Sequence, residues 1–360
     1  MSNLLHVILL FLRFPTWMKS IINPGPYASS KYVFFAVLSL GLCPVFGEIA
    51  HERAGTEEFP FLSTSSFARP AGLAGAHTTL AEGIDAIGSN PAGLAHKPKG
   101  KRVLTGFKKT FIDVNSGAIS YQFPGMKDVW HALSVDFNHM GKISEIDAEG
   151  RESGKVIQPS NHTPSFSAAK ELSQKVRAGV TAKLVTEYLG DIEYSQMAAG
   201  WALDFGIQIQ PNSKRLAFGL AVINLGKKTV AHLEGGQKDG LLPVEVKGGM
   251  VFHSLSIPRA RFALDLCAPY HNFPYLTGGF EYSLADSFVI RGGTRLNSSD
   301  LKNYFRDYVL SRSVEENTGT NALKLAAGFS LIKNIFSLDY AAQYWHWLGV
   351  VHWVTLKWEV

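Results

Sequence analysis

The sequence predicts an all-β protein, a transmembrane antiparallel β-barrel of about 14 strands with an N-terminal segment plugging its lumen. Apolar and polar residues alternate in many short segments from residue 102 to the C-terminus. This period of two gives a strand one apolar and one polar face. An export signal precedes these segments, and no helix-length apolar run follows it. Together these observations favour a barrel with lipid outside and polar groups inside.

The first element is a signal peptide over residues 1–47. Lys31 precedes a thirteen-residue apolar stretch that ends at Pro44, and small residues follow it, so cleavage is expected after Gly47. A membrane-spanning helix is the alternative. It is less favoured because a helix needs about 20 apolar residues to cross a bilayer.

The region upstream of this stretch does not enter the fold. A second apolar run, Leu4 to Phe14, is also too short to span. We expect translation to start at Met18, which would make residues 1–17 a mis-annotated start. A lipoprotein modified at Cys43 is disfavoured because Leu42 stands where a small residue is required.

The composition of the remaining chain excludes several functions. Residues 1–47 contain three basic and no acidic residues, which leaves 32 basic against 30 acidic residues and no basic cluster for nucleic acid. Cys267 is then alone, so neither an internal disulfide nor a multi-thiolate metal site is expected. The His residues are scattered and no G-x-S-x-G elbow occurs. The sequence therefore predicts no enzyme, no metal site and no cofactor.

Residues 48–101 are expected to form an N-terminal tail and plug segment. Residues 48–66 are predicted to be a loose tail. Residues 67–96 are rich in Gly and Ala and lack period-two patterning, and their middle, 79–87, can form one or two helical turns. A barrel of about fourteen strands is too wide for its own side chains to fill. The segment directly before the first strand is the candidate to fill it.

Residues 102–360 are expected to form the barrel. The predicted strands lie near 102–111, 113–123, 131–140, 163–171, 176–188, 198–210, 214–224, 243–254, 260–267, 276–284, 287–296, 321–330, 335–344 and 349–359. Turn signals separate many of them, as at Pro124-Gly125. Longer connections are expected near 141–162, 225–242 and 297–320. In bacterial barrels the long loops face outward.

Alternation also predicts which way side chains face. Phe205, Ile207 and Phe280 are expected to face lipid. The lumen-facing charges are predicted to include Asp204, Glu281, Arg291 and Asp339. The tryptophans Trp345, Trp347 and Trp353 are read as an interfacial girdle at the bilayer edge rather than as a recognition patch.

Four blocks carry a resemblance to a known family. They are Arg69-Pro70-Ala71-Gly72-Leu73-Ala74-Gly75-Ala76, then Leu80-Ala81-Glu82-Gly83-Ile84-Asp85-Ala86-Ile87, then Asn90-Pro91-Ala92-Gly93-Leu94, and the hairpin Phe280-Glu281-Tyr282 with Asp286 and Arg291-Gly292-Gly293. The sequence resembles the PorV/PorQ family, which belongs with the fatty-acid transporter FadL and its relatives. This resemblance implies an outer-membrane barrel whose N-terminus folds into the lumen.

The chain departs from the family pattern in three places. Ala74 stands where a Gly is usual, Glu82-Gly83 replaces an acidic pair, and Gly88-Ser89 replaces an aromatic residue. These departures bear on the ligand more than on the fold.

The candidate site has two parts. The plug motif comprises Arg69, Gly72, Gly75, Asp85, Asn90, Pro91, Ala92 and Gly93. It is expected to face the lumen charges named above. Arg69, Glu82 and Asp85 are expected to pair with inward charges such as Asp204 or Arg291. The lumen charges could line a solute path, but a salt-bridged network that anchors the plug is favoured. Asn90-Pro91 is read as local turn geometry rather than as a hinge.

Two functions remain open. The resemblance implies a barrel in the outer membrane of a Gram-negative-type bacterium, in contact with its lipid bilayer. It would either pass or bind hydrophobic small molecules, as FadL-like barrels do, or dock secretion-system proteins, as PorV implies for type IX secretion. Transport needs an apolar pocket and movement of the plug, whereas docking needs a partner surface on long loops. The sequence does not decide between them.

Overall fold

The computed structural model describes residues 56–96, 100–110, 113–146, 150–190, 197–212, 215–232, 240–297, 323–345 and 349–360. The expected signal peptide at 1–47 and most of the expected loop at 297–320 lie outside these residues. Within the described part, no helix is long and apolar enough to cross a membrane.

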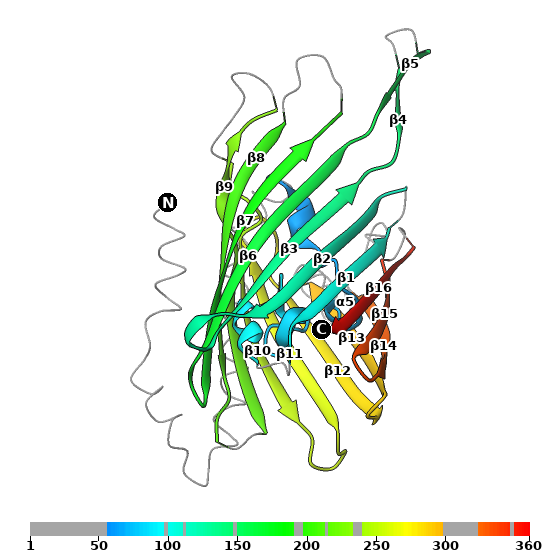
Figure 1. Ribbon diagram of the computed structural model, residues 1–360. Coiled ribbons are helices and arrows are strands. Elements are labelled where there is room, and N and C mark those ends of the chain that lie inside the picture. Colours follow the sequence, from blue (N-terminus) through cyan, green and yellow to red (C-terminus); the bar gives the residue numbers. More distant parts are fainter. Residues whose placement is uncertain are drawn as a thin grey trace, which may run out of the picture. The chain divides into compact units, whose positions relative to one another are not determined.

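Fourteen antiparallel strands close into one barrel (Figure 1). They are β1 (Arg102–Lys109), β2 (Asn115–Pro124), β3 (Val129–His139), β6 (Ser160–Ser173), β7 (Val176–Tyr188), β8 (Ala198–Ile209), β9 (Leu216–Val230), β10 (Glu245–His253), β11 (Ala260–Pro269), β12 (Tyr275–Ala285), β13 (Phe288–Asn297), β14 (Leu323–Lys333), β15 (Phe336–Tyr344) and β16 (Val350–Glu359). β1 pairs with β16 from Arg102 opposite Glu359 to Lys109 opposite His352, which closes the wall. The predicted closed antiparallel barrel and its strand number are confirmed.

The strand faces follow the predicted alternation. Phe205, Ile207 and Phe280 are each 41% exposed on the outward face. On the same strands Asp204 and Glu281 are almost fully buried. A wall one layer thick buries polar groups only on its inner side, so these carboxylates face the interior. The apolar outer face matches the lipid-facing side of a membrane barrel.

The connections divide the barrel into two ends. At the short-turn end, brief turns join β2 to β3, β6 to β7 and the later hairpins, and β16 ends there. At the long-loop end, the connection between β3 and β6 contains a separate hairpin, β4 (Ile143–Ile146) with β5 (Glu152–Ile157). The sequence reading of 141–162 as a loop is therefore wrong in its middle. Both faces of this hairpin are exposed, so buried and exposed residues do not alternate along it. A search for alternating apolar and polar residues therefore misses it.

Residues 56–96, here called the inner segment, pack against the inner face of the wall. It contains η1 (Pro60–Ser63), α5 (Ala68–Gly72), η2 (Gly83–Ala86) and η3 (Pro91–Ala95); a further turn, η4 (Met126–Asp128), joins β2 to β3. α5 contacts β14, β15 and β16, whereas η3 contacts β6, β7 and β8. These strand groups lie on nearly opposite sides of the ring. The inner segment therefore crosses the barrel interior.

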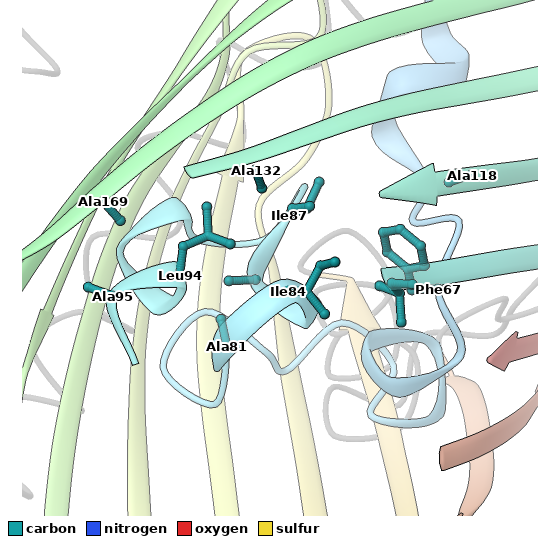
Figure 2. Close-up of a cluster of buried hydrophobic side chains, with 11 residues drawn as sticks. Phe67, Ala81, Ile84, Ile87, Leu94, Ala95, Ala118, Ala132 and Ala169 are labelled. Atoms are coloured by element: carbon teal, nitrogen blue, oxygen red, sulfur yellow. The ribbon is translucent and has the colours of Figure 1, made fainter. Parts of the chain in front are cut away.

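The inner segment has its own apolar contacts with the wall. Phe67, Ile84 and Leu94 pack with small wall side chains such as Ala118 and Ala132 (Figure 2). Small residues on the wall leave room for this packing.

The described part of the expected loose tail, 56–66, is ordered, so that prediction is wrong there. Phe59 is 2% exposed and packs on Val185 and Leu242. Burial of this ring stabilises the segment by about 2 kcal/mol.

Candidate functional site

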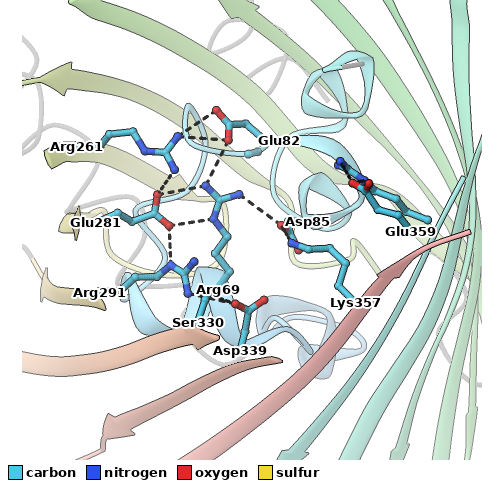
Figure 3. A network of polar contacts seen from close by, with 12 residues as sticks. Arg69, Glu82, Asp85, Arg261, Glu281, Arg291, Ser330, Asp339, Lys357 and Glu359 are labelled. Atoms are coloured by element: carbon cyan, nitrogen blue, oxygen red, sulfur yellow. Dashed lines mark hydrogen bonds and ion pairs between the residues drawn. The ribbon is translucent and has the colours of Figure 1, made fainter. Parts of the chain in front are cut away.

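The centre of the site is Arg69, on α5, which meets Glu281 of β12 (Figure 3). Its Nε donates to Glu281 Oε1 at 3.0 Å and its Nη2 donates to Glu281 Oε2 at 3.2 Å. This two-point contact matches the planar guanidinium to the carboxylate. Both side chains are buried, so the ion pair lies away from bulk water. The pair ties the inner segment to the wall.

Two wall arginines complete the coordination of Glu281. Arg261 of β11 donates from Nη2 to Glu281 Oε2 at 2.7 Å, and Arg291 of β13 donates from Nε to Glu281 Oε1 at 2.6 Å. Arg291 also approaches Asp339 of β15 at 3.4 Å, and Ser330 donates to the same carboxylate. Glu281 and Arg291 are opposite one another in the β12–β13 register. The hairpin singled out in the sequence therefore supplies Glu281 and Arg291, two of the wall residues of the network.

The inner segment returns to this network through two carboxylates. Asp85 Oδ2 accepts from Lys357 of β16 at 2.8 Å and lies 3.4 Å from Arg69 Nη1. Glu82 pairs with Arg261 at 3.2 Å. Burial alone would raise the pKa of Asp85, but the charges of Lys357 and Arg69 outweigh it and hold that pKa below its usual range. The same balance, with Arg261 and Arg69 as the cations, lowers the pKa of Glu82.

Charges balance across this network. It joins four cations, Arg69, Arg261, Arg291 and Lys357, to four carboxylates, Glu82, Asp85, Glu281 and Asp339. Neutrality matters because an unpaired charge in such a place costs several kcal/mol, roughly 3–5 when one partner is removed. The expected salt-bridged network is therefore present, and it connects the inner segment with five wall strands, β11, β12, β13, β15 and β16.

His77 is a buried group without hydrogen bonds on its ring. Both ring nitrogens lack a partner in the described structure, and the residue is 1% exposed. Burial, assisted by the charge of Arg69, lowers its pKa to about 3. The ring is therefore neutral at ordinary pH, and a proton on it would oppose the packing of the inner segment.

Wall side chains also bond the backbone of the inner segment. Asp265 accepts from the Thr78 amide at 2.7 Å, Gln343 donates to the Ala71 carbonyl at 2.7 Å, and Gln208 donates to the Ala81 carbonyl at 2.8 Å. Short helices leave many backbone groups without internal partners, and buried groups need them. The wall supplies them here.

Asn90 anchors the second half of the inner segment. Its Oδ1 accepts from the Ala92 amide at 3.1 Å and so caps η3, which begins at Pro91. Its Nδ2 donates to the Thr78 carbonyl at 2.9 Å and lies 3.3 Å from the Ile207 carbonyl of β8. The interpretation as turn geometry agrees with these contacts, and Asn90 also bonds the wall.

Backbone geometry explains several residues of the motif. Gly75 has φ +91°, and Ala74 has φ 51° although it carries a side chain. A Cβ at Gly93 would lie 2.3 Å from the Ala81 carbonyl oxygen, so a side chain does not fit there. Gly72 makes ordinary contacts, with a Cβ position 3.5 Å from Ala341 Cβ. Ala74, the departure from the family pattern, thus occupies a conformation that favours glycine.

The expected partners of the charges are partly wrong. Asp204 pairs with Lys183 of β7 at 2.7 Å and accepts from the Asn224 amide, rather than bonding the motif charges. Arg69 meets Glu281 instead. Alternation shows which face of a strand a residue lies on, but not its height along the barrel axis. It therefore could not predict which inward carboxylate pairs with Arg69.

The sequence reading of Trp353 as part of an outer girdle is wrong. Trp353 is 2% exposed, packs on Ala68 and Ala71, and donates from Nε1 to the Ser65 carbonyl at 3.0 Å. Exposed and buried residues alternate along β16, so Trp353, which follows the exposed His352, faces inward. Sequence reasoning also missed Arg261 and Lys357, whose inward parity was readable once the strands were placed.

Two cavities bear on function. One of about 700 Å³ lies on the outward faces of β13–β16 at the short-turn end, between Phe288, Phe336 and Trp358 over Leu338 and Leu356. A much smaller one of about 30 Å³ lies inside and is lined by polar side chains of the segment and of β7, β8, β10 and β11. Among the described residues, no group of three His, Cys, Asp or Glu side chains is placed to hold a metal ion.

No protein-family model and no curated protein matches the chain by sequence. Solved structures do match it by fold. The toluene transporter TodX of Pseudomonas putida superposes with a TM-score of 0.57 at 11% identity, over 82% of this chain and 98% of that one. The CymD monoaromatic hydrocarbon channel superposes with a TM-score of 0.54 at 12% identity, and a Pseudomonas aeruginosa FadL homologue with a TM-score of 0.50 at 10% identity. Both matches cover 82% of this chain and 98% of the other chain.

The likeness is one of fold. At these identities it shows that the chain has the closed barrel of those structures, over nearly their whole length. Membership of the PorV/PorQ family stays a prediction from the motifs.

Proposed function

We propose that this protein is an outer-membrane barrel that passes hydrophobic small molecules and that the inner segment closes its lumen until it moves. The observation that carries the proposal is the inner segment itself, which crosses the interior and is attached to the wall by ionic and hydrogen-bonded contacts as well as by apolar packing. Polar contacts exchange with water more readily than a continuous apolar core does. The barrel fold that the chain shares with hydrocarbon channels supports the cargo class.

The outward faces support the location. Large apolar side chains such as Phe205 and Phe280 are exposed along the wall, as expected for contact with a bilayer. The apolar cavity on β13–β16 gives hydrophobic molecules a further contact on the lipid side. The segment packs on both apolar and charged groups of the inner wall, so passage requires the segment to shift.

A disulfide lock tests the movement. A Cβ at Gly72 would lie 3.5 Å from Ala341 Cβ, which is within the range for a disulfide. In a Cys267→Ala background, Gly72→Cys with Ala341→Cys should therefore join α5 to β15 under oxidation. Gram-negative cells producing this variant should accumulate labelled toluene slowly when oxidised and regain the rate of the parent after reduction.

The matched control is Ala341→Cys alone, which should take up toluene equally well in both redox states. Equal uptake by the locked and the reduced double variant would mean that this end of the inner segment does not move during passage. No uptake above cells lacking the protein would remove the transport proposal itself.

A second candidate, docking of secretion-system proteins in the manner that PorV implies, is favoured by the β4–β5 hairpin. Ile143, Ile146 and Val156 are at least half exposed there at the long-loop end. If toluene uptake is absent, deletion of residues 143–157 followed by a secretion assay in the native host is the appropriate measurement. Loss of secreted cargo would support docking.

A further inference from the structure

Two cations face each other on the inner wall outside the network described above. Arg295 of β13 and Lys324 of β14 are opposite one another in the strand register. Both have the inward parity of their strands and are half-buried. They lie beyond Gly293, against which Leu73 packs, towards the long-loop end. Like charges directly opposite in a sheet repel one another.

Aromatic rings hold both cations in place. The Arg295 guanidinium carbon lies 3.4 Å from the ring centre of Tyr275, and Lys324 Nζ lies 4.3 Å from that of Trp345. Cation–π contacts of this kind orient a charge without neutralising it. Arg295 also donates from Nε to Asn297 at 3.2 Å.

No carboxylate in the described part of the chain neutralises this pair. Glu245, which bonds the Tyr275 hydroxyl, is paired with Lys247 at 2.7 Å. Thr277 is opposite Arg295 in the register, and its buried hydroxyl has no hydrogen-bond partner among the described groups. The wall therefore carries two adjacent positive charges without a carboxylate partner among the described residues, whereas the neighbouring network is electrically balanced.

We propose that Arg295 and Lys324 form a binding site for an oxyanion, a carboxylate or a phosphate group. The planar fork of Arg295 matches two oxygens of such a group, and Lys324 adds a second charge. The bound anion relieves the repulsion between the two cations. The site lies on the long-loop side of the inner segment.

Calorimetric titration of the full chain in detergent tests the site, with sodium benzoate and inorganic phosphate as separate probes at fixed ionic strength. The wild-type protein should bind at least one probe saturably. Arg295→Gln with Lys324→Gln should weaken that binding at least tenfold. The matched control, Arg259→Gln with Lys333→Gln, removes the same charge from exposed turns and should change the affinity less than twofold.

Binding of benzoate alone assigns an organic carboxylate, binding of phosphate alone assigns a phosphate, and both results support the site. Heat-modifiable migration on a gel reports whether each variant is folded. If the double variant does not fold, Lys324→Gln must weaken binding while Lys324→Arg retains it. Absence of saturable binding to the wild-type chain, or equal loss in the control, overturns the proposal.

Discussion

Arg69 is the residue on which most of the ionic attachment converges. Its guanidinium touches Glu281, Asp85 and Glu82, and it is 6% exposed. Arg69→Met keeps the length but leaves the four carboxylates facing three cations. Because one carboxylate charge is then left buried without a cation, we expect a loss of roughly 3–5 kcal/mol in the free energy of unfolding. Urea denaturation of the purified barrel measures it.

The matched control for Arg69 is Arg259. It pairs with Asp286 at 3.2 Å on an exposed turn, so Arg259→Met should cost less than about 1 kcal/mol. Comparable losses at the two positions would show that the buried network contributes no more than a surface pair.

His77 gives the attachment a pH dependence. Its pKa in the folded protein is about 3, below the value of about 6.5 for a free imidazole, so the unfolded state binds the extra proton. The stability that neutral His77 contributes is therefore fully present above about pH 6.5, and it is lost as the pH decreases towards 3. Because the pKa values of Asp85 and Glu82 are also lowered, the stability that these carboxylates contribute is present above about pH 4 and is lost as the pH falls below it.

Conductance in planar bilayers should consequently rise between pH 7 and pH 5. His77→Leu should remove this rise and increase the unfolding temperature, because it deletes two buried ring nitrogens that lack partners. The same pH dependence in the variant would assign the effect to another group.

At the scale of elements, inward-facing glycines of the wall leave space that the inner segment occupies. A Cβ at Gly206 of β8 would lie 2.0 Å from Asn90 Oδ1, so Gly206→Val must displace the start of η3. We expect a folded barrel that leaks small polar solutes faster in liposomes. Gly248→Val on β10 is the control, since nothing lies within 4 Å of its Cβ position. Equal leakage from both variants would mean that the contact at Gly206 does not help to close the lumen.

The strands themselves predict an asymmetric response to charge. Leu203 of β8 shares the outward parity of Phe205, so Leu203→Arg near the middle of the membrane should cost roughly 2–4 kcal/mol. Leu203→Met conserves volume and should cost less than about 1.5 kcal/mol. Folding titrations in lipid vesicles compare the two. A tolerated arginine would place this face away from lipid.

The sequence predicted the strands well because alternation is a local property. All fourteen barrel strands were readable from it, and so were the faces of residues such as Phe205 and Asp204. It did not predict which charges meet, as Arg69 with Glu281 shows, because heights along the barrel depend on the whole ring. It also misplaced Trp353, where an aromatic near a strand end was taken as interfacial although its parity pointed inward. The β4–β5 hairpin was missed because both of its faces are exposed.

For the whole molecule, the wall and the inner segment have separable stabilities. Each wall strand bonds two neighbours, so the barrel satisfies its own backbone without the segment. The segment depends on the wall for its backbone partners and its charges. The segment thus needs the wall, but the wall does not need the segment. A segment that closes the lumen and moves must have this relation to a wall that stays folded.

Liposome swelling with a chain that lacks residues 67–89 tests the central claim, that the inner segment closes the lumen. The deletion removes Arg69, Glu82 and Asp85 and leaves all fourteen strands. We predict a barrel that retains heat-modifiable migration and admits small sugars faster than the full chain. A truncated barrel that folds but swells no faster would contradict the account.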